Sequence, residues 1–429
     1  QKMSSFPSSF SSSSSSSSRI RLFLAGDFMP GRGVDAVMPS PCPREIREGF
    51  CKDAFDYARL AEQKSKRRFA DTKKKVSARD VLGEVAKVIE RFEPHARMLN
   101  LETSVTKKSS FYPHKGINYR ASEENMFALL DVLKPDIVSL ANNHAMDFSR
   151  EGMEDTLKFF DSIDNKMRVK RIGAGWNIAD AMKPAVLENV YPYGFAPARN
   201  DKRGVDVAAF GLCFEDSGVP REWQSTERSM GVFLATEDDK VPERLLSAIA
   251  KIKKESSNNA IVVVSVHFGS NWGFEVPRSH VTAAKALVDA GADVVHGHSS
   301  HHAKTAMLYK KKLILFGCGE FFNDYEGIRP HPGFPETSYL GHLRLLYFVD
   351  VDAKTHNFSK LEIVLMRQKM FALTTLENPR EEAEQFLATL RQQYAFGHLK
   401  LQLKGDGTTL IAWPDDAVRL RRRSDDDEL

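Results

Sequence analysis

Short apolar runs alternate with segments of helical periodicity over most of the chain. The run 20–25 is followed by a polar turn, and the run 261–266 is almost entirely β-branched. Short β-branched runs separated by helical periods are typical of strands in a buried, mostly parallel sheet. The same pattern predicts further strands at 98–102, 137–140, 205–212, 293–295 and 313–316. Helical periodicity predicts helices over 81–92, 122–133 and 281–290.

The pattern changes after Leu340. Apolar positions alternate over 343–351 and again over 361–365, which predicts an antiparallel pair of strands. Pro379 then opens a predicted helix with acidic residues early and Arg391 late, an order that suits the helix dipole. These elements predict an α/β, layered fold with a mostly parallel central sheet, helices on its faces and added antiparallel strands toward the C-terminus.

A potential metal ligand follows each of five different apolar runs. These residues are Asp27, Glu102, Asn143, His267 and His298. In open α/β sheets, ligand sites collect beyond the carboxyl ends of the strands, so we expect the five side chains to converge. Any one of them alone would be an ordinary loop residue. Oxygen and imidazole ligands without thiolates suit zinc, manganese or iron(II), so the series predicts one or two divalent metal ions.

Composition narrows the class of protein. Lys+Arg 61 against Asp+Glu 57 leaves a net charge of +4, which argues against a dedicated nucleic-acid binder. The sequence contains no stretch of about 18 apolar residues, so it predicts no membrane span. The 4 cysteines form no CxxC pair, which argues against a disulfide scaffold and favours a reducing, cytoplasmic location. The oligomeric state is not indicated by the sequence.

The two ends and one internal segment differ from the rest of the chain. The serine run before residue 19 predicts a disordered segment at 1–18, without the apolar region of a secretory signal. One domain is expected over 19–400, with a basic insertion at about 58–80 that either forms a solvated helix face or binds an acidic polymer. Residues 401–429 are expected to form a charged tail. Its last four residues, DDEL, resemble a retrieval signal, and a solvated tail is the alternative.

The order Asp, carboxylate, Asn-His, His, Gly-His-x-x-His resembles the plan of calcineurin-like metallophosphoesterases. More closely, the chain resembles the capsule synthesis protein CapA family, which is linked to poly-γ-glutamate synthesis and related to those enzymes. The matching segments are GDFMPGRGVD (26–35), NLETSVT (100–106), ANNHAMDF (141–148), SVHFGSNW (265–272), GADVVHGHSSHH (291–302) and GCGEFFNDYEG (317–327).

The resemblance implies a role for each residue. The implied metal ligands are Asp27, Glu102, Asn143, His267, His298 and His301. His302 competes with His301 for the last position, and His296 is expected to be a buried, hydrogen-bonded histidine. His144 would be the general acid that protonates the leaving group. Arg32 would bind an anionic group, or else form a salt bridge with Asp35.

The implied reaction is attack of a metal-activated hydroxide on a phosphoester, a related ester or amide, or a poly-γ-glutamate-type anionic substrate. One departure from the phosphatase pattern favours an alternative. Met29 stands where those enzymes commonly carry a histidine, so one metal would lose a ligand. The alternative is a protein that synthesises or binds an anionic polymer at the same site without hydrolysis. Phe268 and Glu320 also depart from the family pattern, without removing an expected ligand.

Overall fold

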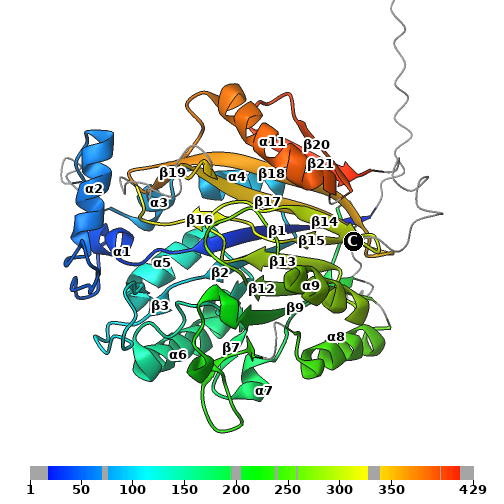
Figure 1. The fold of residues 1–429 in the computed structure, drawn as a ribbon, viewed down its shortest axis with the longest axis horizontal. Coiled ribbons are helices and arrows are strands. Elements are labelled where there is room, and N and C mark those ends of the chain that lie inside the picture. The colour runs from blue at the N-terminus through cyan, green and yellow to red at the C-terminus, as the bar shows by residue number, and fades with distance from the viewer. Residues whose placement is uncertain are drawn as a thin grey trace, which may run out of the picture.

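Two β-sheets packed face to face, with helices on their outer faces, form the core of the protein (Figure 1). The computed structural model describes residues 18–69, 76–193, 195, 204–236, 240–257, 259–326, 339–396 and 398–415. The predicted disordered segment and the DDEL sequence lie almost wholly outside these residues. No helix within these described ranges combines the length and the apolar character needed to cross a membrane.

The first sheet has 10 strands, with β1 (Arg19–Phe28) at its centre. On one side of β1 the strands run parallel: β2 (Ala96–Leu101), β5 (Ile137–Ser139) and β6 (Lys170–Ile172). On the other side they run antiparallel: β17 (Leu343–Asp352), β18 (Phe358–Lys369), β21 (Thr409–Pro414) and β20 (Leu399–Leu403). Two short strands join this sheet, β16 (Glu320–Phe322) beside β1 and β19 (Ala372–Thr374) beside β18. The predicted antiparallel pair at 343–351 and 361–365 is therefore confirmed.

The ordered domain continues past the boundary predicted at residue 400. Strands β20 and β21 form a hairpin that pairs with β18, and Leu399, Leu410 and Ala412 pack into the core. The alternation of these apolar residues spans only two short strands, and the charged residues around their turn obscure it. The first part of the predicted 401–429 tail is thus the edge of the sheet, and residues 416–429 lie outside the described residues.

The second sheet has 7 strands, and its central strands run parallel. The parallel strands are β11 (Leu234–Ala235), β9 (Val205–Phe214), β12 (Ala260–His267), β13 (Val294–His298) and β15 (Lys312–Leu315). The antiparallel strands at its edges are β8 (Ala185–Val190) and β14 (Ala306–Tyr309). The predicted fold class is confirmed, but the strands form two sheets where one central sheet was expected. The period of apolar residues along the sequence identifies a strand, but it does not indicate which other strands pair with it.

Alternation along the strands separates three layers of core. Leu22 and Leu24 of β1 face Ile261 and Val263 of β12 between the sheets, whereas Phe23 packs against the helices on the outer face. The helices over the first sheet are α1 (Gly33–Val37), α2 (Phe55–Ser65), α3 (Ala78–Leu82), α4 (Val85–Phe92), α5 (Glu123–Leu133) and α6 (Ser149–Met167). Those over the second sheet are α7 (Ile178–Ala181), α8 (Glu243–Glu255) and α9 (Arg278–Ala290). The predicted helix opened by Pro379 is α11 (Pro379–Phe396), which packs against the core between the sheets.

Glycines allow the two sheets to meet where β6 approaches β9. A Cβ on Gly211 would lie 2.7 Å from the Cα of Gly173, a backbone atom that cannot move aside. Replacing Gly211 by alanine is expected to cost about 1–3 kcal/mol of unfolding free energy, as overpacking of a close-packed core does. Urea unfolding checks this, with Gly405→Ala as control because nothing lies within 4 Å of the Cβ that would be added there. Equal midpoints for the two variants would contradict the close contact.

Candidate metal centre

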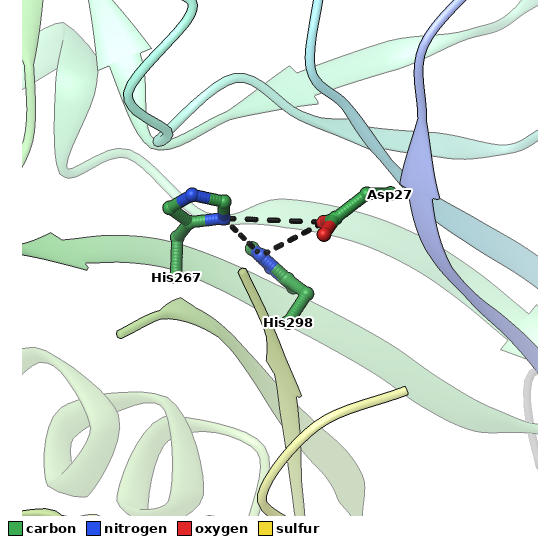
Figure 2. A group of neighbouring side chains, drawn as sticks. All are labelled: Asp27, His267 and His298. Atoms are coloured by element: carbon green, nitrogen blue, oxygen red, sulfur yellow. Dashed lines mark hydrogen bonds and ion pairs between the residues drawn. The ribbon is translucent and has the colours of Figure 1, made fainter. Parts of the chain in front are cut away.

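Three of the predicted ligands meet at the carboxyl ends of β1, β12 and β13 (Figure 2). The Nδ1 atoms of His267 and His298 are 2.8 Å apart, and they lie 4.0 and 3.9 Å from Oδ1 of Asp27. All three side chains are fully buried. Their donor atoms lie within 4.8 Å of one another, which fits the nitrogen and oxygen ligand set of a divalent transition metal. Burial lowers the pKa of both histidines well below its usual value, so both are neutral, as metal ligation requires.

A local irregularity of β1 aims Asp27 into this cluster. The pairing of β1 with β2 shifts register just before Asp27, at Gly26, where a Cβ would overlap the carbonyl oxygen of Gly319. Such shifts redirect side chains at the ends of strands. The Asn100 amide donates to Oδ1 of Asp27 at 2.8 Å, and the backbone N–H of Ser299 donates to Oδ2 at 3.2 Å. Asp27 is therefore fixed before any ion binds.

Glu102 and Asn143 lie beside the trio. Oε1 of Glu102 is 3.9 Å from Nε2 of His267 and 3.7 Å from Nε2 of His144, while its buried Oε2 has no hydrogen-bond partner. Burial, and then the charge of Asp27, raise the pKa of Glu102 well above its usual value. Oδ1 of Asn143 is 3.3 Å from Nε2 of His267. An unpaired carboxylate oxygen in a buried site is a group that a cation would satisfy.

His144 occupies the loop after β5 and is held by a carboxylate that sequence reasoning missed. Its Nδ1 is 2.6 Å from Oδ2 of Asp147, which also accepts the backbone N–H of Tyr119 at 2.6 Å. Lys115 Nζ is 2.7 Å from Oδ1 of the same Asp147. Lys115 Nζ also lies 3.1 Å from Nδ1 of His144. When the Asp147 carboxylate accepts Nδ1–H, Nε2 of His144 carries the free lone pair. Burial lowers the pKa of His144 to about 4, against the opposite effect of Asp147, so the free protein holds it neutral at pH 7.

Asp147 and Lys115 differ in how far the sequence could have pointed to them. Asp147 stands three residues after His144, within the segment ANNHAMDF that matches the family pattern. This spacing could have identified Asp147 as a partner of His144. Lys115 lies outside the segments that match the family pattern, and only the folded loop brings it to the site.

The structure places His301 and His302 outside the trio. Nδ1 of His301 is 2.5 Å from Oε1 of Glu320, and its ring stacks on Tyr325 and Trp272. Burial lowers the pKa of His301, but the hydrogen bond to Glu320 and the charges of Glu320 and Asp27 together outweigh that effect and raise the pKa above its usual value. His302 has its Nδ1 3.0 Å from the carbonyl oxygen of the next residue and also packs against Trp272.

Three other positions behave as packing residues. Met29 is buried, so the position of the missing histidine is filled by an apolar side chain. Phe268 is buried and packs against Phe316. His296 is buried as expected, with its Nδ1 3.4 Å from Oγ of Ser265.

Arg32 is buried and does not pair with Asp35. Its guanidinium binds Asp324 through two nitrogens, and it donates to Glu48 at 2.7 Å and to the Tyr57 hydroxyl at 2.8 Å. Asp35 instead accepts hydrogen bonds from two backbone N–H groups and an asparagine amide. The positive charge of Arg32 therefore faces protein carboxylates.

Comparison with known proteins identifies a family whose model matches this chain. The model of the family described as "Bacterial capsule synthesis protein PGA_cap" matches residues 21–325. A "Probable polyglutamine synthesis accessory protein" of Mycobacterium tuberculosis is 34% identical over 348 residues, covering 81% of this chain and 84% of that protein. The "Capsule biosynthesis protein CapA" of Bacillus anthracis is 32% identical over 221 residues, which cover 51% of this chain and 47% of that protein. The "PGA biosynthesis protein CapA" of Bacillus subtilis is 30% identical over 226 residues, 52% of each chain.

Similarity to solved structures is weaker. The Thermus thermophilus sulfate thiohydrolase SoxB aligns with 89% of this chain and 61% of its own, at 13% identity and a TM-score of 0.36.

Proposed function

Since this chain belongs to the bacterial capsule synthesis protein family PGA_cap, which includes CapA, we propose that it is a metal-dependent hydrolase of an anionic substrate. The substrate class is a phosphoester, a related ester or amide, or a poly-γ-glutamate-type anionic substrate. The observation that carries the proposal is the buried Asp27–His267–His298 trio, with His144 and Glu102 beside it.

The residues of the chain divide the work of such a reaction. A divalent ion, when bound, polarises the ester or amide and activates water near neutral pH. Asp27, His267 and His298 would hold it, and a bound cation would favour the ionised form of Glu102, whose unpaired oxygen lies beside the same space. His144 lies outside the trio, with Nε2 free to exchange a proton with the leaving group.

The electrostatics of His144 favour an anionic substrate. Its pKa of about 4 in the free protein is too low for a general acid at pH 7. A negative charge bound beside the ring would raise this pKa, as an opposite charge within about 4–6 Å does. Lys115, whose side chain is 17% exposed beside Asp147, supplies a cation that would attract such a substrate.

Metal analysis tests the proposal. The purified protein, supplied separately with Mn²⁺, Zn²⁺ or Fe²⁺, is expected to retain bound metal, and Asp27→Ala and His267→Ala are each expected to lose it. His95→Ala is the matched control, because His95 accepts the backbone N–H of Arg21 near the opposite end of β1 and should leave metal content unchanged. Metal content equal to that of wild type in both Asp27→Ala and His267→Ala would contradict the proposal.

Met29 supports a second candidate function. The buried, apolar Met29 leaves fewer ligands than two metals need. The second candidate is therefore a protein that synthesises or binds an anionic polymer at the same site without hydrolysis. Metal-dependent turnover of a phosphoester that disappears in His144→Ala would count against this candidate.

A further inference from the structure

We propose that Lys304 binds a second anionic group of the substrate, a phosphate or carboxylate beside the group that is hydrolysed at the metal centre. The role in substrate binding rests on the proposed function and deepens it. The binding of an oxyanion by Lys304 stands apart from that function, because it needs neither a metal ion nor a reaction.

Lys304 is a buried lysine whose ammonium group is unpaired. The residue is 4% exposed and lies in the loop between β13 and β14. Among the residues that the structure describes, no carboxylate lies within ion-pair distance of its Nζ and no acceptor forms a hydrogen bond with it. Lys115, Lys253 and Lys312 are less deeply buried, yet each forms an ion pair with an aspartate. Lys304 therefore departs from the way this protein treats its other enclosed lysines.

An unpaired ammonium in this position is costly unless something binds it. Burial lowers the pKa of Lys304, because the charged form loses its hydration. Three N–H donors are then left without acceptors in a place that excludes most of the solvent. A phosphate or carboxylate would supply both the opposite charge and the acceptors, in the charge-assisted hydrogen bonds that are the strongest in proteins.

The nearest opposite charge, Asp216, is already committed to other partners. Its Oδ1 accepts the backbone N–H of Gly269 at 3.0 Å, and its Oδ2 is 2.5 Å from Nε2 of His280. The charge of Asp216 partly opposes the effect of burial on the pKa of Lys304, but the two groups do not touch. Asp216 thus favours the charged ammonium and leaves its hydrogens available to a ligand.

Two glycines bring the ammonium to the edge of the metal centre. A Cβ on Gly317 would lie 3.2 Å from Cβ and Cγ of Lys304, and a Cβ on Gly269 would lie 3.6 Å from its Nζ. The carbonyl oxygen of Gly269 accepts from Oγ of Ser299 at 2.8 Å, and the backbone N–H of Ser299 donates to Asp27. One loop therefore separates the ammonium from the metal centre, a separation that a single substrate with two anionic groups can span.

Calorimetric titration with inorganic phosphate tests the anion site. The full-length protein is kept metal-free with a chelator, so that phosphate cannot bind a metal ion. Wild type is expected to bind phosphate, and Lys304→Met to bind it about 10–100-fold more weakly, the usual cost of losing a charged hydrogen bond. Lys251→Met is the matched control, because Lys251 is 71% exposed on α8 and its loss removes the same charge. Equal affinities of the two variants would overturn the proposal, as would absence of phosphate binding by wild type.

Stability without phosphate gives a second readout, with a sign that a structural role would not produce. In a chloride buffer, Lys304→Met should be at least as stable as wild type, because it replaces an unpaired buried charge by an apolar side chain of similar length. Phosphate should then raise the urea midpoint of wild type more than that of Lys304→Met. A midpoint of Lys304→Met below that of wild type in chloride would show that the ammonium stabilises the fold, and would overturn the proposal.

Two phosphoesters decide whether the bound anion belongs to the substrate. Ethyl phosphate carries only the ester phosphate, and 2-carboxyethyl phosphate adds one carboxylate. In metal-loaded protein, Lys304→Met is expected to raise KM for the carboxyethyl ester about 10–100-fold more than KM for ethyl phosphate. Equal changes in KM would overturn the role in substrate binding. Absence of turnover of both esters by wild type would instead overturn the proposed function, and the phosphate titration would still decide the anion site.

Discussion

Replacing His144 by alanine is expected to slow hydrolysis of an alkyl phosphoester about 100- to 10,000-fold, the usual contribution of general acid–base catalysis, without removing the metal. The reason is geometric: the free Nε2 of His144 lies 3.7 Å from Glu102, beside the trio and not within it. Alkoxide is a poor leaving group, so its departure depends on a proton donor. The measurement is steady-state turnover of the metal-loaded protein, together with its metal content.

A second substrate sharpens this prediction. A p-nitrophenyl phosphoester releases a stable phenolate that needs little protonation, so the loss in His144→Ala is expected to be much smaller with that substrate. Equal losses with both esters would contradict the role of proton donor, and loss of metal would move His144 among the ligands. His302→Ala is the matched control, because His302 packs against Trp272 and the neighbouring backbone and should keep both turnover rates.

Local patterns predicted most of the fold and failed where pairing depends on distant residues. β12 and β13 follow from their β-branched runs, and α5 begins after its capping Ser122, as the helical period at 122–133 indicated. The division into two sheets depends on β1 pairing with β17 across more than three hundred residues, which no local period encodes. The predicted helix over 81–92 is broken at Gly83, whose positive φ of 60° ends α3, and whose next residue bonds to a backbone carbonyl of β19.

In the candidate site, too, local patterns predicted some features and failed for those that depend on distant residues. The rule that ligands collect beyond strand ends brought Asp27, His267 and His298 together correctly. The ends of β12 and β13 share one edge of the second sheet, and Asp27 reaches them from β1 of the first sheet. The positions of Ser265 and Lys115 could not be predicted in this way. Ser265 reads as an ordinary residue of a β-branched strand, and its contact with His298 depends on the register of β12 against β13. Lys115 reaches Asp147 only because of the path of a loop.

The second large effect concerns stability, and it follows from the burial of Arg32. Replacing Asp324 by alanine is expected to cost about 3–5 kcal/mol of unfolding free energy, because it leaves a buried guanidinium without its main partner. The two side chains are 1% and 0% exposed. Burial lowers the pKa of Arg32, but the charge of Asp324, together with Tyr119, Tyr57 and Glu48, outweighs this effect, so the pKa stays well above its usual value. Urea unfolding measures the cost, and Glu384→Ala, which removes the exposed partner of Arg380, should change it by less than about 0.5 kcal/mol.

A double variant separates this interpretation from a substrate-binding role for Arg32. Arg32→Met removes the cation, so Asp324→Ala should cost much less in that background than in wild type, and the difference is the coupling between the two residues. The Arg32 guanidinium also lies 4.3 Å from the ring of Tyr119, whose backbone N–H binds Asp147. Loss of Arg32 should therefore loosen His144 as well as the fold. If Arg32→Met instead raised KM alone while the unfolding midpoint stayed at the wild-type value, Arg32 would bind the substrate. That result would contradict a role of Arg32 in stabilising the fold through the buried ion pair.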